Sequence, residues 1–111
     1  MTKGIFQLAT LVTEPPRGAD WLYERKLDGY RAMADLRKKG RVTLTSRNGL
    51  PFEKQFPSVA RAISAMKSLE GTVVDGEIVA YEGKLISFHA MQTSRQGDGV
   101  GLEYMLFDLL A

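Results

Sequence analysis

The sequence predicts an α+β fold, in which a mostly antiparallel β-sheet carries one main helix. Several short segments alternate apolar and polar residues with period two, and glycine-containing turns separate them, as in antiparallel strands. One longer segment instead repeats its apolar residues at helical spacing. The chain has 111 residues, 44% of them hydrophobic. We therefore expect a single domain that spans residues 1–111.

The first part of the chain is expected to hold an arm, a loop and a first strand. The arm covers residues Ile5–Val12, and the cluster Glu14–Gly18, with two adjacent prolines, interrupts regular structure. Residues Trp21–Leu27 are rich in aromatic and apolar side chains and are predicted to form a strand. The pair Asp28–Gly29 that follows is typical of a hairpin turn.

The next two strands are predicted from alternation. Residues 30–36 place Tyr30, Ala32, Ala34 and Leu36 on one face and Arg31, Met33 and Asp35 on the other. Residues 38–40, Lys-Lys-Gly, indicate a turn. Residues 41–45 alternate again, so we expect them to form a hairpin with the preceding strand.

A turn-rich loop at residues 46–51 precedes the one predicted helix. Pro57 stands where the first turn of a helix tolerates proline. The apolar residues beyond it recur at helical spacing, at Val59, Ile63 and Met66. The pattern predicts an amphipathic helix that continues to Leu69 and is closed by Gly71.

The last third of the chain is expected to add two strands and a short helix. Residues 72–81 form a strand interrupted by the polar run Asp75-Gly76-Glu77, and residues 82–84 turn the chain. Residues 87–92 are predicted to form a short helix with Ser87 as its cap, and residues 96–99 a loop. Residues 104–110 are predicted to form a buried strand. The chain stops just after this apolar run, which is unusual for a complete domain.

Composition excludes several classes of site. The chain has no cysteine and one histidine, His89, which argues against disulfides, zinc-thiolate sites and a Ser-His-Asp triad. No apolar run is long enough to span a membrane, and no signal peptide is evident. We therefore expect a cytoplasmic protein that has no membrane partner.

Charge is unevenly distributed along the chain. Residues 1–68 hold 13 basic and 6 acidic residues, a net +7, whereas residues 69–111 hold 2 basic and 7 acidic residues, a net −5. The basic part suggests an anionic partner such as phosphate or nucleic acid. On charge alone, an ordinary solvated surface is the more common explanation.

Lys26 is the candidate nucleophile. In a strand it would share a face with Glu24 and Asp28, and such a pattern is usually a surface ion pair. A lysine amine attacks an electrophile only after losing its proton, which nearby cations, a metal ion or desolvation would favour. The pattern is therefore chemically sensible if a polyphosphate and a divalent cation enter. Gly29, without a side chain, would let phosphates approach the backbone.

Four segments in order resemble the motifs of the covalent nucleotidyltransferases, which include ATP-dependent DNA ligases. Lys26-Leu27-Asp28-Gly29-Tyr30-Arg31 is similar to their K-x-D-G-x-R signature. Ser46–Gly49 with the following residues 52–57, Asp75–Glu77, and Tyr104–Leu109 resemble the next three motifs. The residues of these motifs are most similar to those in the ligase domains of bacterial end-joining systems. The resemblance covers roughly residues 20–111.

The resemblance implies a nucleotide site for ATP with Mg²⁺. Lys26 would attack the α-phosphorus of ATP, expel pyrophosphate and carry AMP. Glu24 would accept from the adenine amino group, and Phe107 would stack on adenine. The AMP would then pass to a 5′-phosphate of nicked or broken duplex DNA, in DNA repair or recombination.

Further residues carry roles by the same resemblance. Arg31 and Arg47 would hold ribose and phosphate or the nucleic-acid end, because a guanidinium fork matches phosphate oxygens. Glu77 would bind the ribose hydroxyls or help to seat the metal, and Asp28 is a candidate metal ligand. Taken singly, Glu77 is better explained as a surface acid, Arg47 as a loop cation and Phe107 as a core residue. Taken together, in the order of the family motifs, the three residues favour the functional interpretation.

The sequence departs from the family after its last motif. The later metal-binding glutamate, the two lysines that touch the α-phosphate and the oligonucleotide-binding-fold domain do not follow. Three hypotheses result. The chain is the N-terminal part of a ligase adenylation domain with weak or no activity alone, it assembles with itself or with a complementary chain, or it is a non-catalytic nucleic-acid-binding module.

Overall fold

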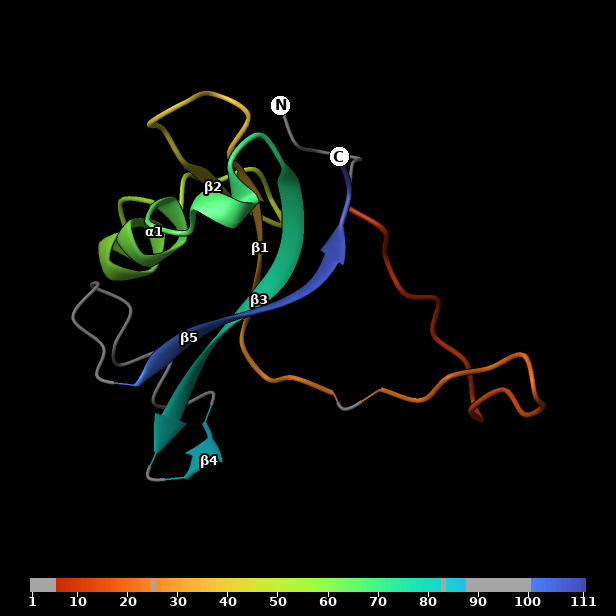
Figure 1. The fold of residues 1–111 in the computed structure, drawn as a ribbon. Helices are drawn as coiled ribbons and strands as arrows, with labels where there is room; N and C mark the ends of the chain where they lie inside the picture. Colours follow the sequence, from red (N-terminus) through yellow and green to blue (C-terminus); the bar gives the residue numbers. More distant parts are fainter. Residues whose placement is uncertain (1–5, 25, 83, 88–100) are drawn as a thin grey trace.

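The computed structural model describes residues 6–24, 26–82, 84–87 and 101–111. Its elements follow the order β1 (Tyr30–Asp35), β2 (Thr43–Ser46), α1 (Pro57–Ser64), the short 3₁₀ helix η1 (Lys67–Leu69), β3 (Val73–Glu82), β4 (Leu85–Ile86) and β5 (Leu102–Leu109). Figure 1 shows the long, curved β3 at the centre of the molecule. The predicted fold class, an antiparallel sheet with one main helix, is confirmed.

Every strand pair in the described part of the chain is antiparallel. The order is β2-β1-β3-β4, and β5 pairs with β3. Residues 73–78 of β3 pair with β1, while residues 74–80 pair with β5. The predicted hairpin of the strands around the 38–40 turn is β1–β2, in which Ala34 lies opposite Leu44. β3 therefore joins the two segments that hold most of the motifs.

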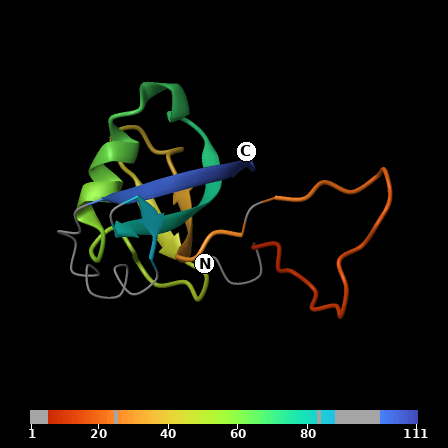
Figure 2. The ribbon, with the colours of Figure 1, turned by 90° about the horizontal axis from the view of Figure 1, so that it is seen from below.

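The main core lies between one face of the sheet and α1. Its buried residues are Ala32, Ala34, Leu36, Leu44, Phe52, Phe56, Val59, Ile63, Val74, Ile78 and Ala80. The predicted alternation of residues 30–36 is confirmed, because the apolar face of β1 lies in this core. The rings of Phe52 and Phe56 meet edge to face at 5.2 Å, which is a favourable aromatic geometry. Figure 2 shows α1 on one side of the sheet.

The helix begins at Pro57 as predicted but ends at Ser64 and not at Leu69. Val59 and Ile63 are buried, whereas Met66 has an extended backbone and is 50% exposed. The chain has to return to the sheet to begin β3. It does so through η1 and Gly71, whose amide donates to the carbonyl of Leu36 at 2.9 Å. That tertiary hydrogen bond is invisible to helical periodicity.

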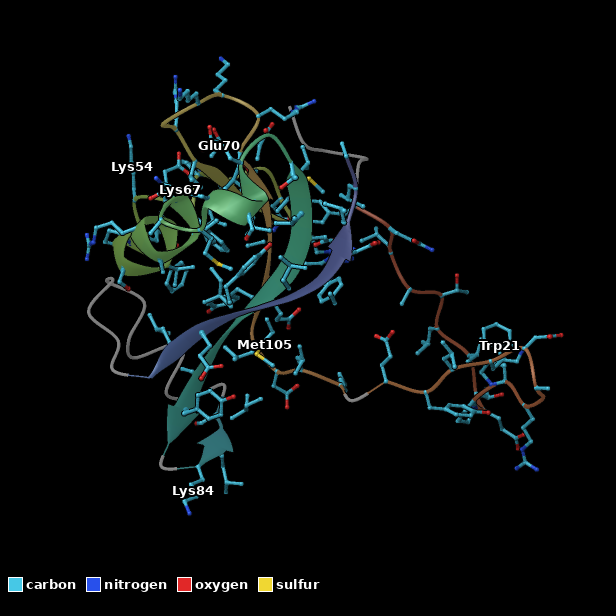
Figure 3. The ribbon with its side chains drawn as sticks, viewed as in Figure 1. Trp21, Lys54, Lys67, Glu70, Lys84 and Met105 are labelled. Atoms are coloured by element: carbon cyan, nitrogen blue, oxygen red, sulfur yellow. The ribbon has the colours of Figure 1, made fainter. Side chains whose placement is uncertain are left out.

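The prediction of a strand at residues 21–27 and a hairpin turn at Asp28–Gly29 is wrong. The described residues of this segment have no strand partner, and Trp21, Leu22 and Tyr23 are 54%, 90% and 68% exposed. Figures 1 and 3 show the segment looping away from the sheet, with Trp21 at its far end. A strand needs a partner as well as β-favouring residues, and no described strand pairs with this segment.

The final strand exists but is not buried. Leu106, Leu109 and Leu110 are 43%, 62% and 44% exposed. One edge of β5 pairs with β3, and no other described strand covers its second edge. The short strand β4 was not predicted. The predicted helix beyond Ser87 and the loop at residues 96–99 lie outside the described residues. Among the described residues, no helix has the length and apolar character needed to cross a membrane.

Candidate functional site

The strand register places the charged motif residues on the face of the sheet opposite α1. Arg31 of β1 pairs with Glu77 of β3, and Met33 pairs with Asp75. Side chains alternate along a strand, so Arg31, Asp75 and Glu77 point to the same face while Gly76 points toward the helix. Two motifs that are 44 residues apart in sequence thus form one polar surface.

Gly76 leaves room for a tyrosine that spans the core side of the sheet. A Cβ on Gly76 would lie 2.7 Å from the ring of Tyr104. The hydroxyl of Tyr104 donates to the carbonyl of Ala32 at 2.8 Å. Burial raises the pKa of this phenol, so it remains a hydrogen-bond donor at neutral pH. Gly76, between Asp75 and Glu77, therefore allows Tyr104 of β5 to cross β3 and form a hydrogen bond to β1.

Arg31 is held by a two-point ion pair with Asp75. Its Nη2 lies 2.6 Å from Oδ2 of Asp75, and its Nε donates to Oδ1 at 3.3 Å. The Asp75 side chain is 4% exposed. The hydrogen bonds from Arg31 to Asp75 raise the pKa of the guanidinium, so its charge is secure. Asp75 was not proposed as a site residue, although it lies in a recognised motif.

Glu77 is tied to the segment that carries Lys26. The backbone N–H of Gly29 donates to Oε2 of Glu77 at 3.1 Å. Burial raises the pKa of the Glu77 carboxyl, and the Gly29 amide and the Arg31 charge act in the opposite direction. A Cβ on Gly29 would lie 2.0 Å from the carbonyl oxygen of Ile78. The expectation for Gly29 concerned phosphate, but in this structure the missing side chain lets the chain pass close to β3.

Arg47 is presented by a tight loop after β2. The N–H of Gly49 donates to the Ser46 carbonyl at 2.9 Å, and the N–H of Leu50 donates to the Ser46 hydroxyl at 2.8 Å. Gly49 has φ +86°, a conformation that favours glycine. Ser46 is buried, whereas Arg47 and Asn48 are exposed at the tip of the loop. The Ser-Arg-Asn-Gly motif thus forms a tight turn that holds Arg47 at an exposed position.

These elements surround one cleft of about 630 Å³, which we call the motif cleft. Its lining residues are Leu8, Ala9, Lys26, Leu27, Gly29, Tyr30, Arg31, Ser46, Arg47, Asn48, Leu50, Phe52 and Glu77. The structure therefore brings together four predicted site residues, Lys26, Arg31, Arg47 and Glu77. Three cations and one acid give the cleft a positive balance suited to an anionic ligand.

Three other predicted site residues do not line this cleft. Glu24 and Asp28 are exposed in the segment before β1. Phe107 lies on β5, at an irregularity where Gly76 pairs with Leu106 but Asp75 pairs with Asp108. Phe107 is 48% exposed, and its ring centroid is 5.8 Å from Cζ of Arg31. This extra residue in the β5 pairing turns Phe107 toward the polar face.

The N-terminal arm is a part of the site that sequence reasoning missed. Phe6 is 8% exposed, shares a small apolar cluster with Met33 and Val73, and has its ring centroid 5.0 Å from Cζ of Arg31. Nη1 of Arg31 donates to the carbonyl of Gln7. Arg31 therefore contacts Phe6 and Phe107 and anchors the arm. No local sequence pattern predicts this contact, because Arg31 and Gln7 are 24 residues apart in the sequence.

The described residues contain no group of three histidine, cysteine or acidic side chains arranged to hold a metal ion. Asp28, the predicted metal ligand, is exposed and has no such cluster around it. A metal cage built from protein ligands does not fit these residues. Magnesium commonly binds through one or two carboxylates together with substrate phosphates, an arrangement that needs no such cage.

The family follows from comparison with known proteins. The family model described as "ATP dependent DNA ligase domain" matches residues 7–111. The chain belongs to this ligase domain family. The resemblance noted in the sequence is thereby confirmed, and its match extends to the N-terminal arm.

Similar proteins carry the same assignment. The "Multifunctional non-homologous end joining protein LigD" of Pseudomonas aeruginosa is 41% identical over 106 residues, which cover 93% of this chain and 12% of that protein. The "DNA ligase C" of Mycobacterium tuberculosis is 34% identical, with coverages of 94% and 30%. The crystal structure of the ligase domain from M. tuberculosis LigD matches with a TM-score of 0.67 and 32% identity, over 79% of this chain and 28% of that one.

These relatives support the first of the three hypotheses, a part of a ligase adenylation domain. The chain spans 12–30% of the length of these relatives. It corresponds to part of an ATP-dependent DNA ligase adenylation domain. The end-joining assignment is supported by the LigD match and by the LigD ligase-domain structure. The comparisons lend no support to a non-catalytic nucleic-acid-binding module.

Proposed function

We propose that this chain supplies the lysine nucleophile and one wall of the nucleotide site for an ATP-dependent DNA ligase reaction. The supporting observation is the motif cleft, in which Lys26, Arg31, Arg47 and Glu77 meet although they come from three separate motifs. A scattered set of surface charges would not converge on one hollow. The positive balance of the cleft suits a triphosphate.

The proposed reaction forms one bond and breaks one bond. The neutral amine of Lys26 attacks the α-phosphorus of ATP, so a nitrogen–phosphorus bond forms. The bond from the α-phosphorus to the bridging oxygen breaks, and its electron pair leaves with pyrophosphate. The proton that the ammonium group loses goes to solvent. A 5′-phosphate oxygen of nicked or broken duplex DNA then attacks the AMP phosphorus, and the nitrogen–phosphorus bond breaks to free Lys26. The 3′-hydroxyl of the other strand attacks this 5′-phosphate, AMP leaves, and the strands are joined.

The other site residues are proposed to hold the nucleotide. Arg47, at the exposed tip of its loop, contacts phosphate oxygens. Glu77, fixed by the Gly29 amide, accepts from the ribose hydroxyls. Glu24 accepts from the adenine amino group, and Phe107 offers its exposed ring for stacking on adenine. These roles follow the family resemblance.

Arg31 is proposed to act mainly by holding the N-terminal arm and β3 in place beside the cleft, and less by binding the nucleotide directly. Its guanidinium already donates to Asp75 and to the Gln7 carbonyl, so fewer donors remain for the ribose or phosphate. Magnesium, proposed to enter on the triphosphate, would neutralise phosphate charge, with Asp28 as a nearby carboxylate. We place the reaction in the cytoplasm, consistent with a chain that has no cysteine.

Labelling with α-³²P-ATP and magnesium tests the nucleophile. The chain spans 28% of the solved ligase-domain chain that it matches, so we expect only trace acid-labile label and no nick sealing. Lys26→Ala should abolish the label, whereas Lys54→Ala, at an exposed lysine outside the cleft, should retain it. Label that survives Lys26→Ala would refute the nucleophile. Stoichiometric label would refute the expectation of trace activity. It would mean that a second copy of the chain, or a group other than those named, completes the site. The proposed contact for a second copy or a complementary chain is the edge of β5 that no described strand covers.

A titration tests nucleotide binding separately from chemistry. In heteronuclear NMR spectra, millimolar ATP with magnesium should move the amide signals of Lys26, Gly29, Asn48 and Glu77. The signal of Lys84, in the turn between β3 and β4, serves as the control. If the cleft signals move no more than that of Lys84, the nucleotide site is placed wrongly.

A further inference from the structure

Five cations gather at the end of β1 that lies away from the motif cleft, and we call them the basic end: Arg37, Lys38, Lys39, Arg41 and Lys67. The first four lie on the turn between β1 and β2. The N–H of Arg41 donates to the Lys38 carbonyl at 3.1 Å, and Gly40 takes φ +73°, so the turn is tight. Lys67 is the first residue of η1 and joins them through the fold.

Two hollows open among these cations. Lys38, Lys39, Arg41 and Lys67 line the first, of about 240 Å³, and Ser64 adds a hydroxyl to it. The second, of about 370 Å³, is lined by Asp35, Arg37, Lys38, Arg41 and Thr43. Lys38 and Arg41 therefore border both hollows. A ligand that follows this surface meets positive charge on two sides of the turn.

Most of this charge is not neutralised by ion pairs within the part of the chain that the structure describes. Arg37 pairs with Asp35 at 2.7 Å. Among the described residues, Lys38, Lys39, Arg41 and Lys67 form no ion pair. Asp35 and Glu70 are the acids in the two linings, so five cations face two acids, a net +3. On an ordinary solvated surface, lysines are usually spread apart. Here the cations come from two elements, the β1–β2 turn and η1, and together line the same two hollows.

The basic end and the motif cleft are close enough together to contact one DNA duplex. Arg31 lines the motif cleft and Leu36 lines the first hollow, five residues further along β1 and the chain that follows it. At about 3.4 Å per residue, these two positions lie about 17 Å apart. Each DNA strand advances about 3.4 Å per nucleotide, so this distance corresponds to about five base pairs. Figure 1 shows the β1–β2 turn and the segment entering β1 at opposite ends of that strand.

We propose that the basic end binds backbone phosphates of duplex DNA about five base pairs from the strand end held at the motif cleft. This proposal rests on the proposed ligase function and deepens it by naming a second contact with the DNA substrate. Lysines on an open surface contact phosphates without reading bases, so the contact is independent of sequence. It would hold the duplex in register while the 5′-phosphate faces the nucleotide.

Fluorescence anisotropy with a labelled, nicked 20-base-pair duplex, measured over a range of salt concentrations, tests the proposal. Each lost phosphate contact should lower the steepness of log K against log salt by about 0.9, or about eightfold in affinity at 0.1 M salt. We expect a steepness loss of about 1.8 for Lys38→Gln with Lys39→Gln, and about 0.9 for Lys67→Gln. Arg17→Gln with Lys84→Gln removes the same charge as the first pair elsewhere and should change neither value.

Three results would overturn the proposal. Equal losses in the control pair would mean that net charge alone binds DNA. An unchanged Lys67→Gln variant would mean that the first hollow is not used. NMR shifts of Lys39 and Lys67 with inorganic tripolyphosphate, as large and as saturable as those with duplex, would assign the site to a small anion. ATP-induced shifts in the motif cleft should persist in every variant, so failure here is distinct from failure of the nucleotide site.

Discussion

Replacement of Gly29 by alanine is the sharpest test of how the motif that carries Lys26 is seated. The added Cβ would lie 2.0 Å from the carbonyl oxygen of Ile78 and 3.0 Å from Cγ1 of Val79. Real Cβ atoms essentially never approach closer than 3.0 Å, so about 1.0 Å of movement is required. The Ile78 carbonyl belongs to the central strand β3, so the chain before β1 has to move instead.

That movement has two costs. Overpacking against a rigid backbone costs about 1–3 kcal/mol. Displacement also breaks the hydrogen bond from the Gly29 amide to the Glu77 carboxylate, and a bond to a charged group contributes about 1.5–3 kcal/mol. Glu77 is only partly buried and can turn toward water, so we take the lower end of that range. The expected loss in the free energy of unfolding is roughly 2–5 kcal/mol.

Urea unfolding followed by far-UV circular dichroism measures this loss. Trp21 is 54% exposed on the N-terminal loop, so its fluorescence would report poorly on the sheet. Gly40→Ala is the matched control, because its Cβ meets nothing within 4 Å and only the positive φ costs energy, about 1–2 kcal/mol. If Gly29→Ala loses no more than Gly40→Ala, the close approach to β3 does not exist in solution.

Three further outcomes follow from the same contacts. Asp75→Asn leaves the Arg31 guanidinium without its charged partner, and since Arg31 keeps some solvent contact we expect a loss of about 2–4 kcal/mol on thermal unfolding, with a near-native value speaking against the ion pair. The folded pKa of Glu77 is raised by burial, so its contribution to stability is fully present below its unfolded pKa and is lost as pH rises through the folded value. Stability relative to Glu77→Gln should therefore fall as pH rises above about 4.5, and a rise would refute the buried carboxyl. Tyr104→Phe removes the hydroxyl that donates to Ala32 and should cost about 1 kcal/mol in urea, whereas an unchanged midpoint would contradict that bond.

Local pattern was sufficient for much of the sheet. The β1–β2 hairpin was predictable because period-two alternation and a glycine turn are properties of adjacent residues. The start of α1 at Pro57 was predictable for a similar reason. The end of α1 was not, because the Gly71 amide bonds to Leu36, a residue distant in sequence. Exposure of β5 was also not predictable, because an apolar strand has the same pattern whether or not another layer covers it.

Motifs were sufficient to name candidate site residues, but not to predict how those residues assemble. The sequence by itself identified Lys26, Arg47 and Glu77 as candidates, because each stands in a recognisable short motif. Only the tertiary structure decided that these residues border one cleft, since the register of β1 against β3 sets which side chains share a face. Contacts between the N-terminal arm and Arg31 were likewise beyond sequence reasoning. Motifs record which groups a reaction needs, whereas long-range backbone pairing determines where those groups meet.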